Sequence, residues 1–186
     1  MEMKSNVKEK TNTTNEWQRK HGICMSHRRL PEFFVTGMSV LADQSQLVNA
    51  KTIANLWKRF SNRVNTISTR VHRSSWRKFG ITYDAIPGTQ YMYMAAVETN
   101  TDASHSGMKT MRIPAMEYLC FTHAGSFWQI KDTYRQIYKN IIPENSIKKL
   151  PAAECGIEHL EWYDHHFHWS KPESKIFIYI PMKKAL

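Results

Sequence analysis

The sequence predicts an α+β fold in which two pseudo-symmetric strand-helix-strand-strand modules form one antiparallel sheet with both helices on one face. The chain has 186 residues, which is the size of one domain. The same order of elements occurs twice, first in residues 33–97 and again in residues 111–182. One such module cannot bury its helix and its sheet face alone, so we expect the two to pack side by side. The seam between them is then a natural cleft.

The first module starts with a strand. Residues 33–40 are β-branched and aromatic with rough alternation, which predicts this strand. A helix follows, with Asn49 as its N-cap, and residues 67–79 indicate a second short helical piece. A hairpin closes the module, with strands in residues 81–84 and 91–97 around a Pro-Gly turn. The apolar side chains at helical spacing are Ile53, Leu56, Trp57, Phe60 and Val64.

The second module repeats this order. Residues 111–123 predict one continuous strand, and Gly125 ends it. Apolar residues at helical spacing predict a helix over residues 127–141, which Pro143 closes. Residues 157–164 and 175–182 predict the last two strands. We expect residues 30–186 to form the domain.

Residues 1–29 are expected to be a polar tail that is partly disordered, with residues 1 to about 15 poorly ordered. The tail is too short and polar for a helix-turn-helix domain. The sequence has no apolar run of the roughly 20 residues that span a bilayer, and no secretory signal. We therefore expect a cytoplasmic protein without membrane contact, in which Cys24, Cys120 and Cys155 are reduced thiols.

The positive charge is concentrated in the first half of the chain. The formal net charge is +10, and residues 51–78 carry eight Lys or Arg residues and no acidic residue. We call residues 51–78 the basic block. Such a surface steers anionic partners, so an acidic protein or DNA is a candidate partner here. The alternative is a solvated helix face that keeps the protein soluble.

The order and spacing of several short motifs resemble the GyrI-like effector-binding domain, a small-molecule-binding domain that also occurs in multidrug-sensing transcription regulators. The resemblance covers about residues 30–184 and includes Gly37, Leu56-Trp57 and Tyr91-Met92-Tyr93 in the first half. The motifs of the second half are Ile113-Pro114-Ala115, Tyr118-Leu119-Cys120-Phe121-Thr122-His123-Ala124-Gly125, Thr133-Tyr134-Arg135-Gln136-Ile137-Tyr138, Leu160-Glu161-Trp162-Tyr163-Asp164 and Ile178-Tyr179-Ile180-Pro181-Met182-Lys183.

The resemblance implies a ligand pocket between the two modules, in which Glu161 matches the acidic residue that faces cationic aromatic ligands. It also implies that Trp57 and Tyr93 face the pocket. The chain departs from the family's regulators because it carries only the tail where they carry a DNA-binding domain, so we expect a stand-alone form. The basic block is also heavier than the family pattern requires.

The residues themselves leave the role of Glu161 open. On a strand, Glu161 shares one face with Ile157, His159 and Tyr163. If this face meets the helices, the carboxylate enters an aromatic environment, and a cationic ligand would supply the pairing charge. The alternatives are an exposed strand residue or a pair with an internal arginine.

Further aromatic side chains are expected at the seam, although a stripe of aromatic residues on a helix can also be ordinary core. The candidate ligand-binding residues are therefore Glu161, Trp57, Tyr93, Phe127, Trp128 and Tyr163. Phe127 and Tyr134 each fit the core as well as they fit a pocket.

Cofactor, metal and nucleophile chemistry have little support in the sequence. The histidines near the end of the chain lack thiols at zinc-like spacing, the cysteines have no identifiable base, and the glycines form no phosphate loop. We expect no cofactor and no metal. These histidines are His159, His165, His166 and His168.

Three functions remain from the sequence. The first is a binding protein for hydrophobic, cationic aromatic molecules. The second, implied by the resemblance, is a hydrolase of strained-ring alkylating compounds with Glu161 as general base. The third, also implied by it, is an inhibitor or adaptor that acts on a macromolecule such as DNA gyrase.

Overall fold

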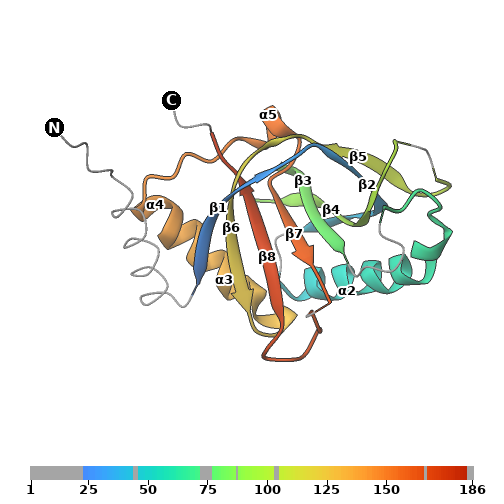
Figure 1. Cartoon of the computed structure of the whole chain (residues 1–186). Coiled ribbons are helices and arrows are strands. Elements are labelled where there is room, and N and C mark those ends of the chain that lie inside the picture. Colours follow the sequence, from blue (N-terminus) through green and yellow to red (C-terminus); the bar gives the residue numbers. More distant parts are fainter. Residues whose placement is uncertain are drawn as a thin grey trace.

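Eight strands form one antiparallel sheet in the order β1-β6-β8-β7-β3-β4-β2-β5, and the sheet curls into a half-barrel (Figure 1). The computed structural model describes residues 23–183 apart from 44–45, 72–76, 87, 103–104 and 166, and without the side chains of residues 46–49. The strands are β1 (Cys24–Leu30), β2 (Phe33–Asp43), β3 (Lys78–Ile86), β4 (Gln90–Thr99), β5 (Lys109–Ile113), β6 (Met116–Ala124), β7 (His159–Tyr163) and β8 (Lys175–Pro181).

The predicted pseudo-symmetric modules are confirmed. β3 and β7 pair at the centre of the sheet, followed by β4 and β2 on one side and by β8 and β6 on the other. The edge strands are exchanged between modules. β1 precedes the first module in the chain but pairs with β6, whereas β5 precedes the second module and pairs with β2. The modules are thus joined by the central strand pair and by both edges.

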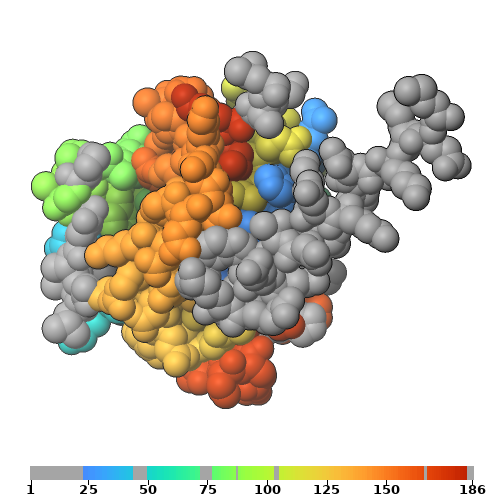
Figure 2. Space-filling model, turned by 90° about the vertical axis from the view of Figure 1, so that its left-hand side faces the viewer, coloured from blue at the N-terminus to red at the C-terminus, as the bar shows by residue number. Residues whose placement is uncertain are grey.

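Both long helices cover one face of the sheet (Figure 1). The first is α2 (Gln46–Arg63), which continues into the short η1 (Val64–Thr66). The second, residues 127–144, consists of η2 (Phe127–Gln129), α3 (Ile130–Gln136), the wider π-turn η3 (Ile137–Ile141) and α4 (Ile142–Glu144). The π-turn contains Lys139, the residue whose carbonyl the Pro143 ring would meet in a regular α-helix. In Figure 2 this helix and the segment after it form much of one side of the molecule.

Each face of the sheet has its own apolar core. Under the helices, Leu56, Phe60 and Ile137 pack against residues of both modules, including Phe121 and Ile178. The opposite face curls around a second core, in which β-branched and aromatic residues of the central strands are fully buried. The short helix α5 (Ala152–Cys155) contributes Cys155 to this second core, whose central members are Ile81, Met94, Tyr118 and Leu160.

Four local expectations are corrected. Residues 24–29, assigned to the tail, belong to β1, a charged edge strand whose polar sequence hid its pairing. Asn49 is not an N-cap, because α2 already begins at Gln46. Residues 111–123 form two strands instead of one, because Pro114 interrupts the strand between β5 and β6. The helical piece expected in residues 67–79 is also wrong where the structure describes it: residues 67–71 form a turn with a bridge from Arg70 to Thr99, and β3 already begins at Lys78. Residues 72–76 and the expected disorder of residues 1 to about 15 lie outside the described residues.

No helix in the described ranges is long and apolar enough to cross a membrane.

Candidate functional site

A buried carboxylate lies beneath the two helices at the centre of the sheet. Glu161 in β7 is 3% exposed, and three tyrosine hydroxyls donate hydrogen bonds to it. Tyr93 and Tyr163 each reach Oε2 at 2.6 Å, and Tyr134 reaches Oε1 at 2.7 Å. We call Tyr93, Tyr134 and Tyr163 the tyrosine triad. Its neutral O–H groups solvate the carboxylate in place of water but leave its negative charge uncancelled.

The triad comes from three elements that the fold brings together. Tyr93 lies on β4, Tyr163 lies two residues beyond Glu161 on β7, and Tyr134 projects from α3. The β3–β7 register places Gly80 directly opposite Glu161. A Cβ atom on Gly80 would lie 2.1 Å from the Tyr93 hydroxyl and 2.3 Å from Glu161 Oε2. The absence of a side chain at Gly80 therefore creates the space in which the hydroxyls reach the carboxylate.

The tyrosine hydroxyls of the triad stay protonated at neutral pH. Burial, and next the negative charge of Glu161, raise the pKa of Tyr93, Tyr134 and Tyr163 well above the ordinary value of 10.0. A deprotonated tyrosine beside this carboxylate would place two negative charges in the core. All three groups consequently act as hydrogen-bond donors.

An aromatic hollow of about 510 Å³ adjoins the triad on the helix-covered side of the sheet. Trp57 connects the two, because its indole Nε1 donates to the Tyr93 hydroxyl at 3.3 Å and its ring meets that of Tyr163 edge-on at 5.1 Å. The loop after β7 closes the hollow with Trp169, whose ring lies 6.3 Å from Trp57 and 4.6 Å from Phe127. The aromatic side chains that line the hollow are Trp57, Trp128, Tyr163, Phe167 and Trp169.

The hollow also carries charged groups. Lys58 from α2 and Lys78 from the start of β3 line it together with Asp164. Burial lowers the pKa of Lys78, which reflects its position against the wall. The charged side chains of the lining are thus two ammonium groups and one carboxylate.

The six candidate residues separate into two groups. Glu161, Trp57, Tyr93 and Tyr163 are buried and in direct contact with one another. The second group consists of Phe127 and Trp128. Phe127 packs on Trp169 of the loop after β7, and Trp128, which is 57% exposed, lines the hollow. Neither alternative for Glu161 applies in the described structure, because it is not exposed and its hydrogen bonds come from tyrosines.

Sequence reasoning missed Trp169 and Phe167 and left Tyr134 undecided. Trp169 and Phe167 lie in the loop between β7 and β8, where no periodicity indicates which way a side chain points. Tyr134 follows the apolar stripe of its helix, so its pattern is that of a core residue. What distinguishes Tyr134 from a core residue is the hydrogen bond from its hydroxyl to Glu161. The sequence does not predict this bond, because a tyrosine hydroxyl needs a partner only when it is buried.

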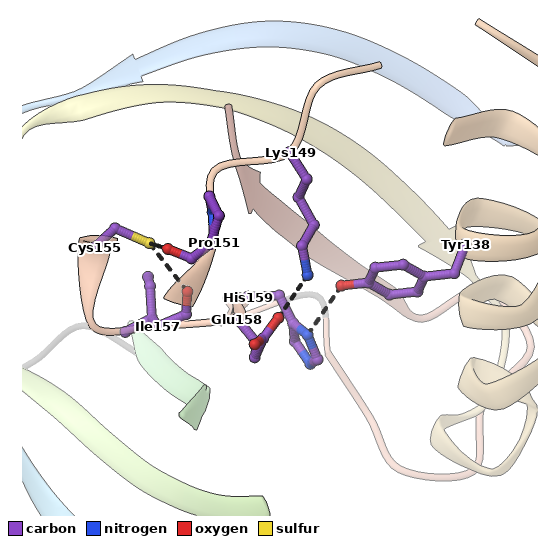
Figure 3. Close-up of polar contacts among 7 residues, drawn as sticks. All are labelled: Tyr138, Lys149, Pro151, Cys155, Ile157, Glu158 and His159. Carbon is purple, nitrogen blue, oxygen red and sulfur yellow. Dashed lines mark hydrogen bonds and ion pairs between the residues drawn. The ribbon is translucent and has the colours of Figure 1, made fainter. Parts of the chain in front are cut away.

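Next to the triad, His159 is held neutral. Its Nδ1 and the Tyr138 hydroxyl share a hydrogen bond of 3.3 Å, while Lys149 pairs with the adjacent Glu158 (Figure 3). The Tyr134 ring lies 4.8 Å from the His159 ring. Burial, and then the charge of Lys149, lower the pKa of His159 from 6.5 to about 3. Among the described residues, no three His, Cys, Asp or Glu side chains gather closely enough to hold a metal ion.

We expect stability to fall as the pH drops from about 6.5 toward 3, because the unfolded chain then takes up a proton on His159 that the folded chain excludes. Between these values the group contributes a slope of at most about 1.4 kcal/mol per pH unit. Urea unfolding at several pH values measures it. His159→Gln, which keeps a polar partner for Tyr138 but does not titrate, should flatten the slope. Parallel curves for both proteins would show that His159 plays no part.

Comparisons with known proteins identify the family. The family model of Cass2, an integron-associated effector binding protein, matches residues 28–182. The transcriptional regulator BrlR of Pseudomonas aeruginosa is 28% identical over 154 residues, which are 82% of this chain and 53% of BrlR. The chain thus spans about half the length of this curated relative.

Two solved structures share the fold. SAV2435 bound to tetraphenylphosphonium aligns with a TM-score of 0.64 at 14% identity, over 86% of this chain and 93% of SAV2435. EcmrR in a DNA complex aligns with a TM-score of 0.68 at 13% identity, over 95% of this chain and 64% of EcmrR. The family match covers most of the described residues and agrees with the resemblance to the GyrI-like domain. The chain therefore belongs to the Cass2 family of GyrI-like, integron-associated effector-binding proteins.

Proposed function

We propose that this protein binds hydrophobic, cationic aromatic small molecules in the cytoplasm, in the aromatic hollow between its two modules. Glu161 attracts the ligand's positive charge, and the aromatic rings of the hollow supply contact area. Membership of an effector-binding family supports small-molecule binding in general. The tetraphenylphosphonium complex of SAV2435, a protein of the same fold, supports this ligand class in particular.

The observation that carries the proposal is that no ion pair within the described part of the chain includes Glu161. A buried carboxylate is normally paired with a cation, because desolvation of an isolated charge is costly. Here its hydrogen bonds come from neutral hydroxyls, and Tyr163, which donates one of them, also lines the hollow together with Trp57. A cation against those rings gains roughly 0.5–2 kcal/mol per ring from cation–π attraction. It gains the carboxylate's attraction in addition.

The geometry favours binding over hydrolysis. A general base needs a lone pair directed at the water that it activates. Oε2 of Glu161 already accepts two hydroxyls and Oε1 accepts one, so three of the roughly four acceptor positions of the carboxylate are occupied. We therefore place the strained-ring hydrolase behind the binding function.

The acidic partner of the basic block remains a prediction. Lys51, Lys58 and Arg59 are exposed on α2, so part of this block is available on the surface. Binding to DNA that weakens steeply with added salt would support such a partner, and no binding at low salt would exclude DNA.

Calorimetric titration with three phenyl compounds of similar shape tests the proposed function. We expect the tetraphenylphosphonium cation to bind more tightly than neutral triphenylphosphine oxide, and the tetraphenylborate anion to bind most weakly. The order follows from the negative charge beneath the hollow. Equal affinities, or tighter binding of the anion, would contradict a site that selects cations.

Trp128→Ala should weaken tetraphenylphosphonium binding by about two- to twelvefold, which corresponds to the roughly 0.5–1.5 kcal/mol of one aromatic contact. The free energy of unfolding should change by less than about 0.5 kcal/mol, because the side chain is 57% exposed. Trp169→Ala is the matched control, since this ring packs between Trp57, Phe127 and Phe167 and its loss should lower both affinity and stability. An unchanged affinity in Trp128→Ala would remove Trp128 from the site.

A further inference from the structure

A second hollow, of about 600 Å³, lies on the face of the sheet away from the long helices. It extends over strands β1, β6, β8 and β7, which lie side by side in Figure 1. Aromatic residues form its centre, and an arginine lies toward each side, Arg28 from β1 and Arg77 just before β3. We call this hollow the arginine groove. Its volume is in the range of ordinary ligand pockets.

The strand register separates the groove from the Glu161 site. Trp162 lies between Glu161 and Tyr163 on β7, so its side chain points to the opposite face of the sheet. Trp162 pairs with Phe177 on β8, and Phe177 pairs with Thr122 on β6. In the neighbouring row, Tyr179 pairs with Cys120, which pairs with Ser26. The residues of these two rows line the groove, so the sheet lies between the two hollows except at its end, where Asp164 lines both.

The groove combines flat rings with planar cations. The rings of Trp162 and Tyr179 are stacked at 5.9 Å with an interplanar angle of 29°. The Arg77 guanidinium carbon lies 5.2 Å from the centre of the Trp162 ring, which orients this group at the wall. Arg28 and Arg77 are both exposed, so each can meet an incoming ligand.

The balance of formal charge in the groove is positive. Arg28 and Arg77 contribute two positive charges, and Asp164 contributes one negative charge. A guanidinium binds a carboxylate or a phosphate through two parallel hydrogen bonds, which a neutral group cannot match. This chemistry is opposite in sign to that of Glu161.

We propose that the arginine groove is a second ligand site, which binds a small planar aromatic anion bearing a carboxylate or a phosphate. The rings of Trp162, Phe177 and Tyr179 cover the ligand's apolar surface, and Arg28 and Arg77 bind its anionic group. The binding groups differ from those of the cation site, because these three rings and both arginines line the groove and not the hollow on the helix side.

Titration of the whole protein with three naphthalene probes tests this site. We expect naphthalene-2-carboxylate or 2-naphthyl phosphate to bind at least about tenfold more tightly than uncharged naphthalene-2-carboxamide, a ratio that corresponds to about 1.4 kcal/mol. The two anions distinguish a carboxylate ligand from a phosphate ligand. The double variant Arg28→Gln/Arg77→Gln should lose this preference and keep the melting temperature, because both side chains are exposed.

Two control variants locate the site. Glu161→Gln should keep the preference for the anion, and so should Lys58→Gln, because Glu161 lies beneath the helices, Lys58 lines the hollow on the helix side, and neither residue lines the groove. Failure of the cation site would thus leave this result intact. The proposal is overturned if the wild-type protein binds anion and amide equally, if the double arginine variant retains the preference, or if Lys58→Gln abolishes it.

Discussion

Glu161→Gln is expected to weaken tetraphenylphosphonium binding by more than about tenfold and to leave the binding of triphenylphosphine oxide nearly unchanged. The substitution keeps the size of the side chain and one acceptor oxygen but removes the charge. A close charge contact in a partly desolvated site contributes about 2–5 kcal/mol, and each 1.4 kcal/mol is a factor of ten. Calorimetric titration of both ligands with both proteins gives the comparison.

The empty protein should tolerate this change. The Glu161→Gln variant would lose the charge-assisted character of three tyrosine hydrogen bonds, but it would also be relieved of the buried charge. We expect these terms to offset one another to within about 2 kcal/mol of unfolding free energy. Equal weakening of the charged and the neutral ligand would mean that Glu161 shapes the hollow without selecting charge.

Gly80→Ala is expected to be the more damaging change for the fold. The new Cβ atom would lie 2.1 Å from the Tyr93 hydroxyl, 2.3 Å from Glu161 Oε2 and 2.8 Å from Tyr93 Cζ. Tyr93 is 2% exposed and Glu161 is 3% exposed, so neither can swing into solvent. Overpacking costs about 1–3 kcal/mol, and each buried hydrogen bond that breaks costs about as much again. Urea unfolding should therefore show a loss of more than about 2 kcal/mol, together with loss of cation binding.

Two controls separate this clash from a general effect of replacing glycine. Gly88→Ala adds a Cβ atom that meets nothing within 4 Å, so only its left-handed backbone, with φ of +78°, resists the change. We expect a cost of about 1 kcal/mol there and normal ligand binding. Gly80→Ala combined with Tyr93→Phe removes the nearest clashing atom and should recover part of the stability. A mild Gly80→Ala variant that still binds cations would show that the triad is not held by this close approach.

The modules were predictable from the sequence because their helices and inner strands carry strong periodic patterns. Ile53, Leu56, Trp57 and Phe60 mark the buried face of α2, and all four are buried. β1 was not predictable in the same way. Its residues include His27, Arg28 and Arg29, so it lacks a continuous apolar face. Such an edge strand is held by backbone pairing with β6, which is distant in the sequence.

The candidate site was predictable only in part, for a related reason. Glu161 stood out because the motif around it resembles a known family, and Trp57 and Tyr93 followed from the same comparison. Tyr134 and Trp169 become site residues through contacts that join elements far apart in the chain. The role of Gly80 depends on one register between β3 and β7, which no local pattern specifies.

The structure of the protein with tetraphenylphosphonium bound tests the central claim most directly, because it locates the cation relative to Glu161. We expect the phosphonium centre in the hollow beside Trp57 and Tyr163, within about 6 Å of an aromatic ring, and closer to Glu161 than to Lys58 or Lys78. A cation bound elsewhere, for example on the opposite face of the sheet, or held by Asp164 at a distance from Glu161, would contradict the account.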